Sequence, residues 1–393
     1  MRRSYRLLYT VATVVVAGAL AVVFFGMKGD PPPRPAPPAA PPALPPERAE
    51  KVEGKDYFPP ALTYAWKTYT TKDGLPSDKA HSIRVDGDRV WIGTDEGLVR
   101  YEDGAFQVFT EADGLVHPLV LSIDVDPATG DVWIGTMGGV NRYSRGRFET
   151  FTQLGSGLAN DVVYAVSVDG PHVWFATASG ISRFDTRTRQ WRIFNETNTP
   201  MHEPWCYAVA PAEDKVYFGI WASGVLEYDR RTEVWKVYHD PDGEFEVDIF
   251  PDDGPVNDVT SSLAYDQGTV WHATYFGLTT YDGTRWRGFF DHDSGLSSNF
   301  INFVRAAGPY GWIGTDRSLD AFDGATWYTY RRTADGRGET LVRTADGRQT
   351  RYAAPTGPAH NYVLGVDFQR ERVWIATEGG VSVGTPVRQA DAR

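Results

Sequence analysis

Histidine, cysteine and acidic side chains are the groups in this chain that could carry chemistry, and their spacing matches no standard catalytic pattern. The sequence contains no His-Glu-x-x-His motif, no Gly-x-Ser-x-Gly motif and no phosphate-binding glycine loop. Cys206, the only cysteine, occupies a position where small apolar residues recur in related segments, so we expect it to be buried and unreactive. We therefore predict no catalytic residue, no bound metal and no cofactor.

Four histidines leave an enzymatic alternative open, because they fall near one expected end of the fold. They are His81, His117, His202 and His360. Their convergence on nearby carboxylates around a cation would indicate acid–base or metal-assisted chemistry. A fifth histidine, His272, replaces the Ile or Phe of equivalent strands and is expected to be a packed core residue.

Aromatic side chains indicate a binding site. Eleven of the 13 tryptophans fall into two recurring columns described below, and only Trp205 and Trp221 do not. The predicted ligand-binding set comprises Trp205, Trp221, Tyr275, Phe276, Phe300 and Tyr362, with Asp95, Glu96, Asp316, Arg317 and Glu378 at its rim. Aromatic faces stack on sugar rings or peptide side chains, and polar rims fix the orientation of a ligand. The alternative is that these aromatics bury one another and plug a channel.

A repeat of 41 to 43 residues must position these side chains. An apolar–aromatic strand followed by a glycine turn occurs seven times, and its spacings are 42, 41, 43, 54, 41 and 62. The aromatic residues of this column are Trp91, Trp133, Trp174, Tyr217, Trp271, Trp312 and Trp374. A period of this length is typical of one four-stranded propeller blade.

A second motif, aromatic-x-x-aromatic, also occurs seven times and has the pattern of an outermost strand. Its copies begin at Trp66, Phe106, Phe148, Trp191, Trp235, Trp286 and Trp327. The copy at 66–69 precedes the first tryptophan strand and none follows the last, so we expect the N-terminal strand to complete the seventh blade. The predicted fold is all-β: a seven-bladed β-propeller closed by an N-terminal outer strand.

Residues that recur in most blades are expected to serve the scaffold. A glycine follows the tryptophan strand in six repeats, where a turn needs a positive φ; these are Gly97, Gly139, Gly180, Gly224, Gly277 and Gly380. Short polar residues recur just before the innermost strands and are expected to hydrogen-bond the loop backbone. They are Asp78, Asp161, Asp258, Asn299 and Asn361.

The repeat also carries Asp73-Gly74-Leu75-Pro76-Ser77-Asp78, Asp113-Gly114-Leu115 and Trp-Ile-Gly-Thr strands followed by Gly-Leu or Gly-Val. With these motifs, residues 64–384 resemble the two-component-regulator propeller family of ligand-binding sensor propellers. The resemblance implies the extracytoplasmic half of a sensor, which in some members binds oligosaccharides. Little sequence follows the last repeat, so we expect a stand-alone, membrane-anchored form without a kinase.

The N-terminal segment is expected to direct export. Three arginines within residues 1–6 precede residues 7–27, which are uncharged and long enough as a helix to cross a bilayer at about 31 Å. The basic flank should remain cytoplasmic. Ala19-Leu20-Ala21 leaves a cleaved signal peptide as the alternative. Residues 28–60 form a Pro-rich linker, and the protein is expected to be single-pass in a bacterial inner membrane, with the propeller periplasmic or extracellular.

The propeller is expected over residues 61–386, with a tail at 387–393. Two insertions explain the long spacings: the acidic segment 240–256 and a hairpin at 331–358. The spaced carboxylates around 240–253 are of the kind that binds Ca²⁺, but they lack the full pattern of a Ca²⁺-binding loop with its distant bidentate Glu, so we expect a solvated acidic loop. The net charge is −12, and because residues 1–55 carry +4, the remainder carries −16. Such an acidic body argues against binding to nucleic acid.

Together these features predict a membrane-tethered, non-catalytic binding or sensor propeller. It should recognise a glycan, a peptide or a partner protein at its loop face. Two alternatives stay open. One is a propeller enzyme, similar to the streptogramin lyases, that uses funnel histidines and carboxylates. The other is an assembly scaffold whose channel is plugged.

Overall fold

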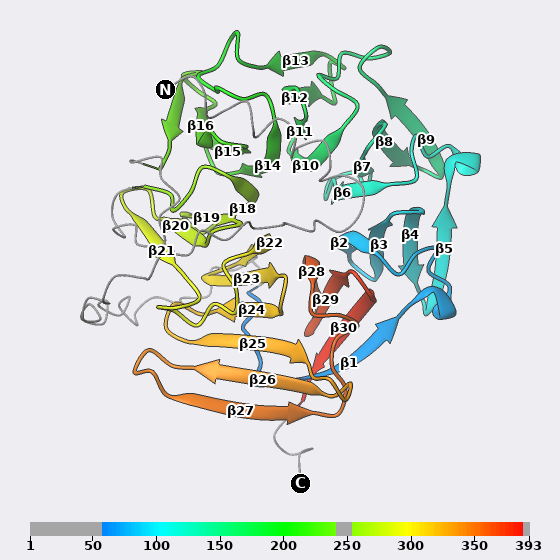
Figure 1. Ribbon diagram of the computed structural model, residues 1–393. Coiled ribbons are helices and arrows are strands. Elements are labelled where there is room, and N and C mark those ends of the chain that lie inside the picture. The colour runs from blue at the N-terminus through cyan, green and yellow to red at the C-terminus, as the bar shows by residue number, and fades with distance from the viewer. Residues whose placement is uncertain (1–56, 241–253, 388–393) are drawn as a thin grey trace, which may run out of the picture. The chain divides into compact units, whose positions relative to one another are not determined.

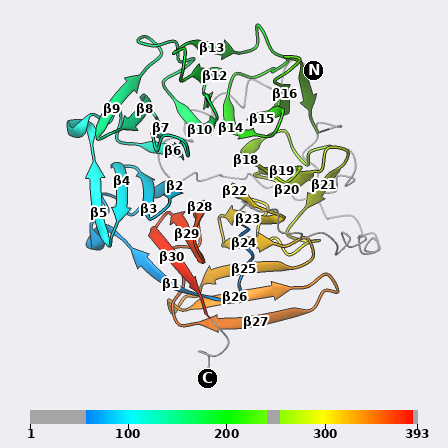
Figure 2. The same cartoon turned by 180° about the vertical axis from the view of Figure 1, so that it is seen from behind.

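The computed structural model describes residues 57–240 and 254–387, which form a seven-bladed β-propeller (Figures 1 and 2). Every sheet is antiparallel; in these residues six sheets have four strands and one has six. The innermost strands of successive sheets contact one another around the ring, and the last of them contacts the first. The prediction of an all-β, seven-bladed propeller is confirmed.

In blades 1 to 6 the strands follow the chain from the innermost strand outward, and in blade 7 the three inner strands do so. Blades 1 to 3 comprise β2 (Ala80–Asp86), β3 (Arg89–Thr94), β4 (Gly97–Glu102) and β5 (Ala105–Phe109); β6 (Val120–Val125), β7 (Val132–Thr136), β8 (Gly139–Ser144) and β9 (Arg147–Phe151); β10 (Val163–Asp169), β11 (His172–Thr177), β12 (Gly180–Asp185) and β13 (Trp191–Phe194). Blades 4 and 5 comprise β14 (Cys206–Pro211), β15 (Lys215–Ile220), β16 (Gly224–Asp229) and β17 (Trp235–Tyr238); β18 (Thr260–Asp266), β19 (Thr269–Thr274), β20 (Leu278–Tyr281) and β21 (Trp286–Phe289). Blade 6 comprises β22 (Ile301–Ala307), β23 (Tyr310–Thr315), β24 (Leu319–Phe322), β25 (Trp327–Arg332), β26 (Gly338–Arg343) and β27 (Gln349–Ala354); blade 7 comprises β28 (Val363–Gln369), β29 (Arg372–Thr377), β30 (Gly380–Pro386) and β1 (Tyr64–Tyr69). The short 3₁₀ turns η3 (Thr71–Asp73) and η4 (Glu111–Asp113) begin the first two blade connections.

Blade 7 takes its outermost strand from the other end of the chain. β1 pairs with β30 in an antiparallel register that runs from Tyr64 opposite Pro386 to Tyr69 opposite Val381. The strand is also tied to blade 6, because the Trp66 N–H donates to Thr356 Oγ1 at 3.0 Å and Thr356 Oγ1 donates to the Trp66 carbonyl at 2.7 Å. The two ends of the propeller therefore share one sheet.

Adjacent blades pack at a distance that one residue of each second strand must permit, the residue two positions after the recurring Trp or Tyr. A Cβ atom built on Gly93 would lie 2.6 Å from Val120 Cγ1, and one on Gly219 would lie 2.2 Å from Thr260 Cγ2, both in the next blade's innermost strand. The equivalent residues elsewhere are also Gly or Ala, namely Gly135, Ala176, Ala273, Gly314 and Ala376. Larger side chains would separate the sheets, since protein interiors are close-packed.

The scaffold residues predicted from the repeats behave as expected. Asp78 Oδ1 accepts the Thr71 N–H at 2.6 Å, and Asn361 Oδ1 accepts the Arg332 N–H at 2.7 Å, as do their counterparts in three other blades. Gly97 has φ of 139°, and a Cβ there would lie 2.6 Å from the Phe109 carbonyl oxygen. Both sets of residues thus fix loops and turns.

The segment 331–358 forms the hairpin β26–β27, and β26 continues the sixth sheet by pairing with β25. Other predicted segments lie outside the described residues: the anchor 7–27, most of the linker 28–60, the loop 241–253 and the tail residues 388–393. In the part of the chain that is described, no helix has the length and apolar character needed to cross a membrane.

His272 is fully buried in β19, as predicted for a core histidine. Its Nε2 lies 2.8 Å from Thr260 Oγ1, while its Nδ1 is a buried atom without a hydrogen-bond partner in the described structure. Burial lowers the pKa of His272 from 6.5 to about 3. The imidazole is therefore neutral at physiological pH.

Acidification should destabilise the propeller through His272. Between pH 6.5 and about 3 the unfolded chain binds a proton that the folded chain excludes, so the free energy of unfolding falls as the pH falls through that window. The loss should be about 3 kcal/mol at pH 4.5 and rise to about 4 kcal/mol near pH 3. Urea titrations at pH 7 and pH 4.5 measure this loss of stability. His272→Ile, which places at this position the residue found in equivalent strands, should reduce the difference in stability between the two pH values. A variant with the same pH dependence as the wild type would contradict the assignment to His272.

Interrupting the pairing of β1 should destabilise the ring. Lys67 is exposed but its backbone pairs with Val383, so Lys67→Pro removes an N–H and distorts the strand. We expect Lys67→Pro to lower the free energy of unfolding by about 2 kcal/mol or more, and Lys67→Ala to change it by less than about 0.5 kcal/mol. Equal unfolding midpoints for the two variants would show that β1 contributes little to closure.

Candidate functional site

Three positions in every blade surround the loop end of the ring, where the blade connections and the middle hairpin turns lie. The loop position directly precedes the innermost strand. The bulge position is the second residue of that strand, and the turn position follows the second strand. We call these 21 residues the mouth.

The bulge position arises from an irregularity shared by all seven innermost strands. In blade 1 the register of β2 against β3 shifts between Ala80 and Ser82, which leaves His81 unpaired, and every other blade shows the same shift. The seven bulge residues are His81, Leu121, Tyr164, Tyr207, Ser261, Asn302 and Leu364. A β-bulge redirects a side chain away from the regular alternation of a strand, and bulges are frequent beside functional sites.

The turn and loop positions are joined through the backbone. The turn-position N–H donates to the loop-position carbonyl in five blades, for example from Trp221 to Trp205 at 2.9 Å and from Asp316 to Phe300 at 3.2 Å. The threonine just before the turn position accepts a hydrogen bond from the residue just after it; in blade 1 the Glu96 N–H donates to Thr94 Oγ1 at 3.1 Å. The scaffold therefore holds these two positions while leaving their side chains free to vary.

The mouth differs in character from blade to blade. Blade 1 contributes Lys79, His81 and Asp95; blade 2 contributes Leu119, Leu121 and Met137; blade 3 contributes Val162, Tyr164 and Ala178; blade 4 contributes Trp205, Tyr207 and Trp221. Blade 5 contributes Val259, Ser261 and Tyr275; blade 6 contributes Phe300, Asn302 and Asp316; blade 7 contributes Tyr362, Leu364 and Glu378. All are half-buried except Val259, which is buried, and Glu378, which is exposed.

Five aromatic rings from blades 3 to 6 form a continuous wall. Tyr164 stacks on Tyr207 at 4.3 Å between ring centroids, Tyr207 lies 5.4 Å from Trp221, and Trp221 lies 6.1 Å from Tyr275. Tyr275 then stacks on Phe300 at 4.4 Å with 9° between the planes. The aromatic wall brings together three predicted residues, Trp221, Tyr275 and Phe300, with two bulge tyrosines that the sequence did not identify.

Burial keeps the wall hydroxyls neutral. It raises the pKa of Tyr164, Tyr207 and Tyr275, and the neighbouring Tyr164 hydroxyl raises that of Tyr207 further. The pKa of Tyr362 is raised by burial first and then by nearby Tyr275, Glu378 and Asp316. These hydroxyls can therefore donate and accept hydrogen bonds without carrying charge.

The charged part of the mouth lies on blades 6, 7 and 1. Lys79 Nζ lies 3.2 Å from Glu378 Oε1, and His81 Nε2 contacts Asp95 Oδ1. Burial lowers the pKa of His81, while the hydrogen bond and charge of Asp95 raise it, and the first effect is the larger. Arg317 Nε lies 4.0 Å from Asp316 Oδ2, whereas Asp316 Oδ1 is buried and has no hydrogen-bond partner in the described structure.

Deeper in the ring an ionic layer joins four innermost strands. Arg84 pairs with Asp124 at 2.9 Å and with Asp367 at 3.6 Å, and Arg305 pairs with Asp367 at 3.0 Å. Arg84 follows His81 by three residues of β2, which is about 10 Å along a strand. The layer therefore lies beneath the mouth.

The other predicted residues lie at or beside the mouth positions. Trp205 holds a loop position and supports Trp221 through its carbonyl, while Phe276, Glu96 and Arg317 follow the turn positions and are exposed. His117 and His360 do not gather with carboxylates: their Nδ1 atoms accept the backbone N–H of Leu119 and Tyr362, as Asn160 Oδ1 does for Val162. The His202 N–H donates to Ser223 Oγ, so of the four predicted histidines His81 is the one that contacts a carboxylate in the described structure.

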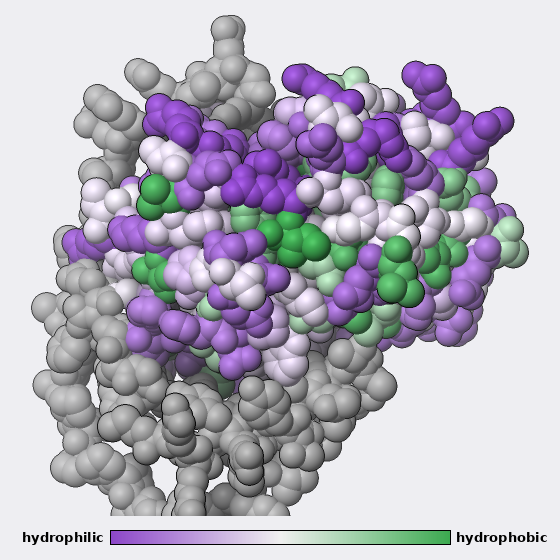
Figure 3. Space-filling model, turned by 90° about the horizontal axis from the view of Figure 1, so that it is seen from above, coloured by the Kyte–Doolittle hydropathy of each residue, from purple (hydrophilic) through white to green (hydrophobic). Residues whose placement is uncertain are grey.

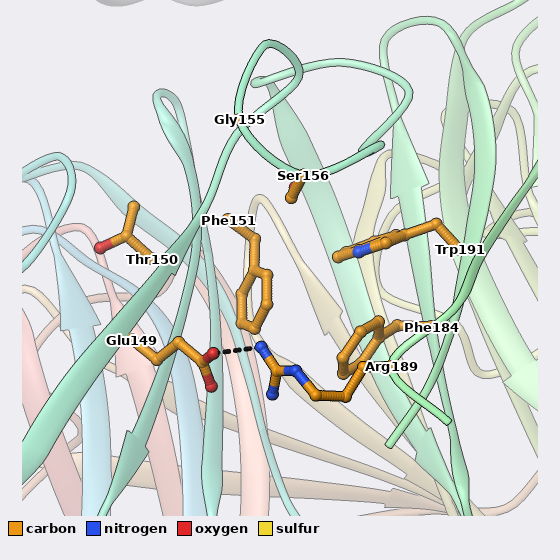
Figure 4. Close-up of a pocket in the computed structure, with 8 residues that line it drawn as sticks. All are labelled: Glu149, Thr150, Phe151, Gly155, Ser156, Phe184, Arg189 and Trp191. Carbon is orange, nitrogen blue, oxygen red and sulfur yellow. Dashed lines mark hydrogen bonds and ion pairs between the residues drawn. The ribbon is translucent and has the colours of Figure 1, made fainter. Parts of the chain in front are cut away.

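The described residues contain no group of three or more His, Cys, Asp or Glu side chains arranged to hold a metal ion. A groove of about 270 Å³ lies between outer strands, away from the mouth. Figure 4 shows its lining, in which Arg189 pairs with Glu149 and lies against Phe151 and Phe184. This arrangement covers the aromatic edge of two blades, which is a structural role.

No family model and no curated protein matches the sequence. The fold is similar to the extracellular domain of BT3049 from B. thetaiotaomicron, assigned to a hybrid two-component system, with a TM-score of 0.64 and 16% identity. That match covers 82% of this chain and 42% of the other, so this chain spans less than half of its length. Virginiamycin B lyase from Staphylococcus aureus matches with a TM-score of 0.57 and 16% identity, covering 82% of this chain and 99% of the lyase.

A third similar structure is PorZ, a surface component of the type-IX secretion system of Porphyromonas gingivalis, with a TM-score of 0.51 and 14% identity. The match covers 83% of this chain and 40% of PorZ. At these identities the likeness concerns the fold alone. Proteins with different roles share this ring, so the role of this chain must be argued from its mouth.

Removing the charge of Asp95 should lower the pKa of His81. Asp95 favours the imidazolium, so Asp95→Asn leaves burial as the dominant influence and shifts the titration to lower pH. Histidine-selective ¹H–¹⁵N NMR across pH 4–8 measures this shift. Glu102→Gln, at the opposite end of blade 1, is the control and should leave the His81 titration unchanged; an unshifted His81 in Asp95→Asn would contradict the pairing.

Proposed function

We propose that this chain is a non-catalytic binding or sensor propeller that recognises a glycan, a peptide or a partner protein at its mouth. The aromatic wall carries this proposal. Its five rings are half-buried at the loop end, whereas the tryptophan column of the blades lies in the core. Large, partly exposed aromatic faces at one end of a fold, where residues differ from repeat to repeat, are typical of ligand sites.

The proposed location is outside the cytoplasm, with residues 7–27 as the tether. The likeness to extracellular domains of proteins assigned to two-component systems supports this location. The charge pattern of residues 1–27 supports the orientation, because the arginines precede the apolar segment.

One observation favours a second candidate, a lyase-like enzyme. His81 lies at the mouth with Asp95 against its Nε2, the kind of pairing that orients a general base. Virginiamycin B lyase shares the fold, and a histidine-to-alanine variant of that lyase is catalytically inactive in a complex with quinupristin. Conversion of a bound ligand by this chain, abolished in His81→Asn while binding persists, would decide for the enzyme.

The third candidate, a scaffold that assembles through an apolar surface, has less support. The large hydrophobic residues that are exposed in the described part of the chain are Leu154, Val234 and Phe276, and each belongs to a different region of the ring. Figure 3 shows one side of the propeller, where hydrophobic residues form small separate patches among hydrophilic ones. An apolar assembly surface is normally larger and continuous.

Truncating the aromatic wall should weaken ligand binding without unfolding the protein. A glycan and peptide array probed with the wild-type chain identifies binders, and calorimetry then compares variants. Trp221→Ala with Tyr275→Ala should weaken binding by about tenfold or more. Tyr352→Ala on β27, which lies outside the mouth, is the control and should bind normally; a folded double variant with unchanged affinity would contradict the proposal.

A further inference from the structure

The mouth combines an aliphatic arc with the aromatic wall, and this restricts the ligand. Blades 2 and 3 present Leu119, Leu121, Met137, Val162 and Ala178, which offer no side-chain hydrogen bonds. A carbohydrate needs donors and acceptors along its ring edges, and this arc cannot supply them from side chains. Aliphatic or aromatic side chains of a peptide match both surfaces.

The polar part of the mouth is negatively charged. Lys79 is the one basic side chain among the 21 positions that is charged at neutral pH, against the three carboxylates of Asp95, Asp316 and Glu378, so the net charge is −2. Glu96 and Arg317, which follow two turn positions, cancel each other. A positive group on the ligand is therefore favoured over a negative one.

Among the described residues, Asp316 is the one carboxylate with a buried oxygen that has no hydrogen-bond partner. Its side chain is 32% exposed, its Oδ1 has no hydrogen-bond partner in the described structure, and its N–H is tied to Phe300 of the aromatic wall. Arg317 Nε, at 4.0 Å from Asp316 Oδ2, is beyond hydrogen-bond distance, so the exposed part of this carboxylate can accept a further donor, and for a carboxylate the strongest donors are ammonium and guanidinium groups.

Building on the proposed function, we infer that the ligand is a peptide segment in which an arginine or lysine adjoins apolar residues. The cationic group binds at Asp316, between Tyr362 and the edge of the aromatic wall. The apolar residues cover the aromatic wall and the aliphatic arc. An aromatic face beside a carboxylate adds cation–π attraction to the ion pair.

The test uses the full chain in detergent and immobilised tetrapeptide libraries with one fixed residue and three random ones. Pools with fixed Arg or Lys should bind about tenfold more tightly than pools with fixed Gln or Glu. Asp316→Asn should reduce this preference to less than about threefold. Asp103→Asn makes the same charge change at the turn between β4 and β5, at the opposite end of a blade, and should keep the full preference.

Two results would overturn the inference while leaving the proposed function intact. One is binding of acidic or neutral pools that equals the basic pools but still falls in Trp221→Ala with Tyr275→Ala. The other is selective binding of an oligosaccharide at the same mouth. Absence of binding by every pool and every glycan would overturn both the inference and the proposed function.

Discussion

The close approach of each tryptophan strand to the innermost strand of the next blade sets the geometry on which the ring depends. At Gly93 and Gly219 a single added carbon would lie within 2.6 Å of the next blade, so the position tolerates only the smallest residues. The bulky partners, such as Trp91 and Val120, then fill the space on either side of this contact. A small residue recurs at this position in all seven blades, and the innermost strands contact one another from blade to blade until β28 lies against β2.

Because the repeated residues make the contacts that hold the ring together, the side chains of the mouth can differ from blade to blade. The bulge at the start of every innermost strand places a side chain outside the alternating pattern, whatever that side chain is. Backbone hydrogen bonds fix the loop and turn positions in the same way, from Trp205 and Trp221 to Phe300 and Asp316. A rigid ring with interchangeable residues at one end is well suited to binding, since ligands gain from a preorganised surface.

Sequence reasoning predicted the parts of this molecule that depend on repetition. The two sevenfold motifs predicted the blades, and comparison between blades identified Trp221 and Tyr275 as departures from the template. It did not identify Tyr164 and Tyr207, because the bulge that places their side chains at the mouth is recognised from the register of paired strands and not from the types of the residues. It also placed His117 near possible chemistry, whereas hydrogen bonding to Leu119 gives it a role in the loop.

The carboxylates of the ionic layer and those of the mouth accept hydrogen bonds from different kinds of donor. Asp124 and Asp367 of the ionic layer accept backbone N–H groups of Val168 and Val85 in the next blades, at 2.7 Å each. Those bonds commit them to the scaffold. The mouth carboxylates of Asp95 and Glu378 instead contact the side chains of His81 and Lys79, which can change rotamer, and Asp316 leaves one oxygen without a donor in the described structure. A charge held by fixed backbone donors has little to offer a ligand, but one held by movable side chains can exchange its partner for a ligand at small cost. The difference in donors, more than the presence of acidic residues, is what separates the mouth from the layer beneath it.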